Sequence, residues 1–259
     1  MVPILHLLIA LALLLCPALA SAQVALVQSN TSTSGTMWTT GSFAEQLCLP
    51  GAVTPGNTLV AWTSWGNSAR TMTADIDAVG AMTTILNKGA TATNGDPAVQ
   101  MFARVATTTE QCVTATISGN DANGIQAFSL AEFSGMAATL STSGGAGVSA
   151  TTSAEITPAN ANHDSGADLT PDTPHNVMLG GSMTTTTSAN WADDGFTMLT
   201  STGTIRHGYL IQSSAGDWVP STSPDTRVSE TGLVNLDGAA VAGGSCRGGL
   251  LLMGVGKCD

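Results

Sequence analysis

The stretch TLVAWTSW at residues 58–65 decides the fold class of this chain. It is a short run of apolar and β-branched residues, and the turn formers Pro55-Gly56-Asn57 stand directly before it. A run of this kind, bounded by Pro, Gly and Asn, is typical of a β-strand. Trp62 and Trp65 are three positions apart, so on one strand they point to opposite faces, and we expect one of them in the core.

Similar short runs recur along the chain with turn signals between them, and no window shows a sustained 3.6-residue apolar period. The sequence therefore predicts an all-β protein, with antiparallel strands arranged as a sandwich or barrel. The expected strands are 24–29, 43–49, 58–65, 71–79, 83–86, 98–105, 112–118, 125–134, 177–185, 196–200, 208–213, 228–233 and 248–255.

The first 22 residues predict a secretory signal peptide, because an apolar run at 5–15 precedes the small residues Ala20-Ser21-Ala22. No later run reaches about 18 apolar residues, so no transmembrane segment is expected. We expect a secreted or extracellular protein, with the cell surface as an alternative. Residues 23–259 are interpreted as one β-sandwich domain with a long irregular crossover at about 141–174, which could instead link two domains.

Charge narrows the set of partners. The chain has a formal net charge of -11 and only seven Lys and Arg residues, which makes nucleic acid and anionic membranes poor partners, so no nucleic-acid partner is expected. Charged residues make up 10% of the chain, and Thr, Ser, Ala and Gly take their place. We therefore expect strands whose outer faces are neutral and covered by hydroxyl groups.

The exported chain keeps four cysteines, Cys48, Cys112, Cys246 and Cys258, which predicts two disulfides. The sequence contains no C-x-x-C motif, so a zinc site is not favoured. Residues 248–257 are expected to form one strand, which at about 3.3 Å per residue holds its ends about 30 Å apart. A disulfide needs Cα atoms within about 7 Å, so Cys246 and Cys258 are not expected to pair with each other. We expect Cys48 and Cys112 each to reach one end of that strand.

The run at 55–61 also resembles the start of a bacterial secreted β-sandwich module, in which Gly, Asn or Asp precedes an apolar strand. At 130–136 the chain has LAEFSGM, where relatives carry EYSGL, so Phe133 replaces a tyrosine. The resemblance covers most of the mature chain and implies a jelly-roll-like sandwich with structural motifs and no shared catalytic set. Further similar segments are 98–105, 112–118, 176–180, 195–197 and 216–218.

Two kinds of side chain could carry chemistry. Glu132 lies between apolar neighbours, so burial could raise the pKa of its carboxyl and make it a general acid; the alternative is that its carboxylate caps a turn. A Ser-His-Asp triad could use His163, His175 or His207, but no G-x-S-x-G elbow exists, and we expect these histidines on exposed loops. No catalytic residue is therefore assigned.

Binding candidates lie later in the chain. Asp164, Asp168 and Asp172 are spaced four residues apart in an acidic loop, and carboxylate oxygens are the ligands that calcium prefers. A solvated acidic loop is the plainer interpretation. Trp191 and Trp218 are candidates to flank a ligand, with packing over the end of the sandwich as the alternative. Calcium is the one cofactor that the sequence suggests.

The sequence thus favours a secreted, non-catalytic surface or extracellular-matrix module that acts through binding or assembly. Glycans, other surface proteins and further copies of the chain are the expected partners. A carbohydrate-binding or calcium-assisted lectin-like domain is the alternative, and an extracellular hydrolase is the third hypothesis.

Overall fold

The computed structural model describes residues 23–33, 43–66, 71–76, 79–89, 98–118, 125–140, 142–150, 177–184, 196–202, 205–211, 229–236 and 238. These residues contain fourteen strands and no helix, and every strand pairing is antiparallel. The prediction of an all-β antiparallel sandwich is confirmed. The predicted leader, residues 1–22, and the predicted last strand, 248–255, lie outside the described residues.

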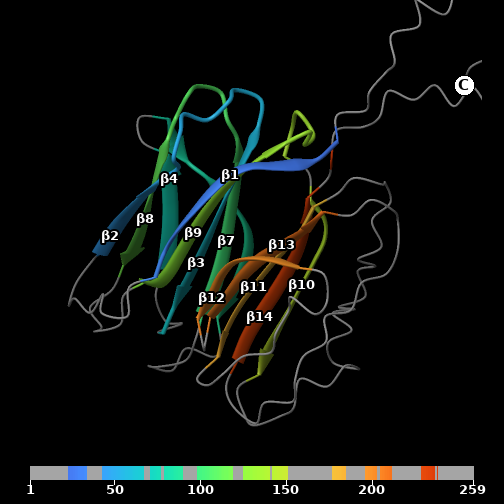
Figure 1. Ribbon diagram of the computed structural model, residues 1–259. Helices are drawn as coiled ribbons and strands as arrows, with labels where there is room; N and C mark the ends of the chain where they lie inside the picture. The colour runs from blue at the N-terminus through green and yellow to red at the C-terminus, as the bar shows by residue number, and fades with distance from the viewer. Residues whose placement is uncertain are drawn as a thin grey trace, which may run out of the picture.

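The strands form three sheets, which are shown side by side in Figure 1. The central sheet has the order β1-β9-β3-β7-β6, the outer sheet β2-β8-β4-β5, and the third sheet β10-β14-β11-β13-β12. Their bounds are β1 (Ala25–Ser32), β2 (Phe43–Cys48), β3 (Thr58–Trp65), β4 (Thr71–Ile76), β5 (Gly80–Ala81), β6 (Thr83–Gly89), β7 (Ala98–Val105), β8 (Cys112–Ser118), β9 (Ile125–Ser134), β10 (Thr142–Ala150), β11 (Val177–Thr184), β12 (Thr197–Thr202), β13 (Ile205–Ile211) and β14 (Ser229–Leu236).

The first nine strands form the jelly roll that the sequence resemblance implied. β1 pairs with β9, β2 with β8, β3 with β7 and β4 with β5, as if one long hairpin had been folded over into two facing sheets. The chain crosses from the outer sheet to the central sheet between β5 and β6. Both sheets of the sandwich are therefore complete by Ser134, the last residue of β9.

The third sheet differs from the expected organisation. Residues 141–174 were predicted to be an irregular crossover inside one sandwich, but Thr142–Ala150 forms β10, which pairs with β14. All the described strands after this point belong to the third sheet, which packs on the face of the central sheet that the outer sheet does not cover. The glycine-rich sequence of β10, TSGGAGVSA, lacks the alternation that marks a half-buried strand, and this explains why it was missed.

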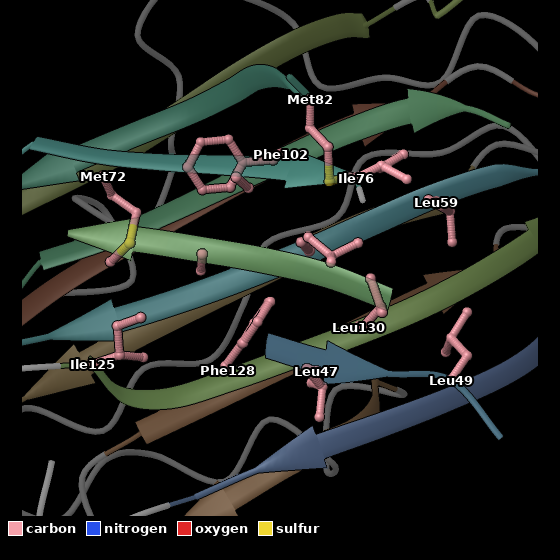
Figure 2. Close-up of a cluster of buried hydrophobic side chains, with 14 of the residues drawn as sticks. Leu47, Leu49, Leu59, Met72, Ile76, Met82, Phe102, Ile125, Phe128 and Leu130 are labelled. Atoms are coloured by element: carbon pink, nitrogen blue, oxygen red, sulfur yellow. The ribbon is translucent and has the colours of Figure 1, made fainter. Parts of the chain in front are cut away.

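The central sheet is buried on both faces, and this is why 58–65 is almost continuously apolar. Every residue of β3 is buried. Trp65 joins the cluster between the central and outer sheets, part of which is shown in Figure 2, whereas Trp62 joins the cluster under the third sheet. The two indoles point to opposite faces as predicted, but both are core residues, because the third sheet covers the second face.

Glycine allows two of the closest approaches. Gly135 has a φ of 72°, and a Cβ atom there would lie 2.5 Å from the carbonyl oxygen of Gln23. Gly181 on β11 faces the central sheet, and a Cβ atom there would lie 2.7 Å from Cγ1 of Val99. The absence of a side chain at Gly181 lets the third sheet settle onto the central one.

The disulfide prediction was wrong in its pairing. Cys48 and Cys112 are bonded to each other, with their Cα atoms 4.0 Å apart. They are directly opposed in the register of β2 and β8, a pairing that the sequence argument did not foresee. Cys246 and Cys258 lie outside the described residues.

Candidate functional site

Two buried side chains, Glu132 and His207, hold the polar groups that could carry chemistry. Both are 0% exposed. Glu132 lies on β9 and points toward loop residues beside the outer sheet, whereas His207 lies on β13 and points into the interface with the central sheet. The two clusters therefore lie on opposite sides of the central sheet.

Glu132 receives three close hydrogen bonds. Its Oε2 atom accepts from Nε2 of Gln28 at 2.6 Å, and its Oε1 atom accepts from the backbone N–H of Thr54 at 2.9 Å and from Nδ2 of Asn57 at 2.6 Å. The Oε1 atom of Gln28 accepts a hydrogen bond from the backbone N–H of Gly51, and its Nε2 atom donates to the carbonyl oxygen of Gly51. The carboxylate thus ties edge strand β1 to the 51–57 loop.

These contacts confirm the turn-capping interpretation of Glu132. Burial alone would raise the pKa of the carboxyl, but the hydrogen bonds from Gln28, Thr54 and Asn57 outweigh it and lower the pKa below its usual value. The carboxylate is therefore ionised at neutral pH. A general acid needs a proton to give, so this environment is the opposite of what that role requires.

His207 forms the second cluster. Its Nε2 atom lies 2.7 Å from Oγ of Ser64 on β3, and its Nδ1 atom lies 2.9 Å from Oγ of Ser129 on β9. Thr31 on β1 places its Oγ1 3.3 Å from Oγ of Ser129. The prediction that His207 is exposed on a loop was wrong, because β13 begins at Ile205 and not at Gly208.

The His207 cluster lacks the features of a hydrolytic site. Ser64 and Ser129 are both 0% exposed, so neither hydroxyl can meet a substrate in this conformation. Burial lowers the pKa of the imidazole to about 3, which keeps it neutral. Serine hydroxyls occupy both ring nitrogens, leaving neither for the carboxylate that orients the base in a triad. The arrangement matches a polar bridge between sheets.

The outward side of the outer sheet is the main described face with neutral hydrogen-bonding groups. Thr116 on β8 lies between Thr73 on β4 and Ala44 on β2, and Thr114 lies between Asp75 and Gln46. Ala44, Gln46 and Thr73 are exposed, and both β8 threonines are half-buried. We call these six residues the threonine face. It agrees with the expectation of neutral, hydroxyl-covered outer faces.

The other predicted site residues lie outside the described part of the chain. They are the calcium candidates Asp164, Asp168 and Asp172, the ligand candidates Trp191 and Trp218, and the histidines His163 and His175. Within the described residues, no group of three His, Cys, Asp or Glu side chains is arranged to hold a metal ion.

Comparison with known proteins found no matching family model, curated protein or solved structure. The described residues include no helix of the length and apolar character needed to cross a membrane.

Proposed function

We propose that this protein is a secreted, non-catalytic surface or extracellular-matrix module that works by binding or assembly. The observation that carries the proposal is how the protein uses two of its buried titratable side chains, Glu132 and His207. Glu132 and His207 are fully buried, and their hydrogen bonds join strands to loops and sheets to sheets. Side chains committed in this way stabilise the fold and have no free atom to offer a substrate.

The threonine face supports the binding part of the proposal. Its side chains are hydroxyls, an amide, a methyl group and one carboxylate, without a cation. A surface of this kind suits a neutral partner rich in hydrogen-bonding groups, because it offers donors and acceptors with little charge to desolvate. The acidic net charge and the predicted leader agree with a protein that works outside the cell.

The test uses protein secreted from the full-length chain. Thr116→Arg places a long cation at the centre of the threonine face, and Thr108→Arg places the same group on an exposed residue of the loop between β7 and β8. We expect Thr116→Arg to weaken binding to immobilised polysaccharides or self-association in light scattering at least tenfold, with Thr108→Arg unchanged. Turnover by the unaltered protein in a broad ester, peptide and glycoside screen contradicts the proposal.

Carbohydrate binding is the second candidate function, favoured by the jelly-roll order of β1–β9. Lectin domains use this architecture, an argument by analogy of fold. A glycan array probed with and without calcium distinguishes the two candidates. Binding that disappears on calcium removal favours a lectin-like domain, whereas self-association without glycan binding favours an assembly module.

A further inference from the structure

The interface between the third sheet and the jelly roll contains a buried imidazole that is not paired with a charged group in the described part of the chain. His207 is hydrogen-bonded through both ring nitrogens to Ser64 and Ser129, which belong to two different strands of the central sheet. A neutral imidazole has one donor and one acceptor nitrogen, so one serine accepts and the other donates. A protonated ring would donate from both nitrogens, and both hydroxyls could accept, so it is the burial of the charge, and not a lost hydrogen bond, that opposes protonation.

We propose that His207 is an acid-sensitive latch: protonation of its ring favours release of the third sheet from the face of the jelly roll. The cost of a buried positive charge is large when no anion pairs with it. Opening the interface lets the imidazole take one proton from the solvent and keep it in water. Acid therefore shifts the balance toward the open form.

Among the described residues, no hydrogen bond or ion pair joins His207 to a carboxylate that would stabilise the cation. The sequences of β1, β3, β11 and β12 include no Asp, Glu, Lys, Arg or second His. On β9 the one ionisable residue is Glu132, which bonds residues of the 51–57 loop on the opposite face.

Other charged and titratable groups on the strands of this interface bond elsewhere or lie on more distant strands, and Lys88 lies on β6, at the opposite edge of the central sheet from β1. On β13, Arg206 is the residue next to His207 and donates to the carbonyl oxygen of Ile205, and the Tyr209 ring packs edge-on against Phe133. On β7, Arg104 donates to carbonyl oxygens of 79–81 beside the outer sheet. Glu230 lies on β14, where it pairs with Met183 of β11, and β11 separates β14 from β13 in the third sheet.

The same interface provides a route for the proton. Ser129 links His207 to Thr31, which is half-buried on edge strand β1. The imidazole is therefore linked through two hydroxyl groups to a half-buried residue at the edge of the central sheet. Because burial lowers its pKa to about 3, the folded form resists protonation while the open form accepts it near pH 6.5.

The sign of the effect follows from these two values. A histidine with a lowered folded pKa stabilises the closed form fully above about pH 6.5, and that stability is lost as the pH falls toward about 3. In that window one proton is taken up on opening, so the opening equilibrium constant should rise about tenfold for each pH unit of acidification.

Hydrogen exchange of the whole secreted protein, measured by mass spectrometry from pH 7 to pH 4.5 and corrected for intrinsic exchange rates, tests the latch. We expect peptides from β11 and β13 to lose protection by about tenfold per pH unit below about pH 6.5, ahead of peptides from β4 and β8. Equal loss in all four strands overturns the proposal. His207→Gln, which keeps a neutral donor and acceptor, should remove this dependence; a slope equal to that of the unaltered protein also overturns it.

A second measurement applies if His207→Gln does not fold. Nitrogen NMR of histidine-labelled protein reports the protonation of each ring, and His163→Ala with His175→Ala leaves His207 as the only histidine after residue 22. We expect its ring to stay neutral at pH 5 in the folded protein. A folded-state midpoint near pH 6.5 contradicts the latch.

Discussion

The two faces of the central sheet are covered by sheets of different character. On the jelly-roll side the outer sheet is bonded within itself by Cys48–Cys112, and the buried polar group beside it is an ionised carboxylate with three close donors. On the other side the third sheet carries a neutral imidazole bridged by two hydroxyls. In the first arrangement hydrogen bonds stabilise the negative charge of Glu132, whereas in the second burial keeps the His207 ring uncharged.

This difference predicts responses to acid that begin at different pH values, below about 6.5 for His207 and below 4.5 for Glu132, and different responses to mutation. Removing a carboxylate that accepts several hydrogen bonds lowers the free energy of unfolding by a large amount, because each buried donor then loses its partner. A neutral bridge contributes less direct energy but depends on its protonation state. We therefore expect the jelly-roll side to be sensitive to loss of Glu132 and the third-sheet side to be sensitive to shape and pH.

The largest effect is expected from Glu132→Ala. It leaves the amides of Gln28 and Asn57 and the N–H of Thr54 without their acceptor, which should lower the free energy of unfolding by about 3–5 kcal/mol in urea titrations at pH 7. Glu110→Ala is the matched control, because Glu110 is also buried but its carboxylate oxygens have no hydrogen-bond partner among the described residues. Equal losses in the two variants would show that burial, and not the hydrogen bonds, accounts for the effect.

The Glu132 contribution also has a defined pH dependence. Because its pKa is lowered in the folded protein, its stabilisation is complete above the ordinary value of 4.5 and is lost as the pH falls through the folded value. The difference between the unaltered protein and Glu132→Ala should therefore shrink below pH 4.5.

A smaller effect is expected from Gly181→Ala on the third-sheet side. The new methyl group would lie 2.7 Å from Cγ1 of Val99 and 3.0 Å from Cε of Met101, so the sheets must separate slightly. We expect a loss of about 1–3 kcal/mol, seen as a lower thermal midpoint. Gly51→Ala is the control, since its methyl group meets only Oε1 of Gln28 at an ordinary 3.5 Å. A neutral Gly181→Ala would mean that the interface has room to adjust.

The paired variants Trp62→Phe and Trp65→Phe compare the two faces directly. Both indoles are buried, but Nε1 of Trp62 has no hydrogen-bond partner among the described residues. Trp62→Phe removes that unpaired N–H as well as packing volume, so it should cost about 1 kcal/mol less than Trp65→Phe. Chemical denaturation of both variants at pH 7 measures the difference in the free energy of unfolding. A larger loss for Trp62→Phe would contradict the prediction that its indole N–H makes no stabilising hydrogen bond.

The sequence was sufficient for most of the described strands, but not for β10 or the start of β13, and it was insufficient for the partners of the strands. TLVAWTSW and its turn glycines predicted β3 because local propensity and burial agree there. Which sheet covers Trp62, and that Cys48 faces Cys112, depend on register between distant strands, which local patterns do not encode. The site shows the same limit. Glu132 was identified because apolar residues surround a lone carboxylate, whereas His207 stands in the mixed sequence IRHGYLI, and only the placement of Ser64 and Ser129 opposite it reveals its role.

The smallest effect is expected at Glu45 on β2. This residue tests whether a carboxylate with fewer hydrogen bonds than Glu132 affects stability differently. Glu45 is half-buried, and its Oε2 atom has no hydrogen-bond partner among the described residues. Burial raises the pKa of this carboxyl, and a hydrogen bond with Ser32 opposes the shift without cancelling it. A raised folded pKa means that the ionised form is disfavoured, so stability falls as the pH rises through the folded value.

Glu45→Gln removes the charge and should raise the free energy of unfolding at pH 7 by about 0.5 kcal/mol, with no gain at pH 4. Urea titrations at the two pH values measure this, and a loss of stability at pH 7 would show that the Glu45 carboxylate is as well compensated as that of Glu132.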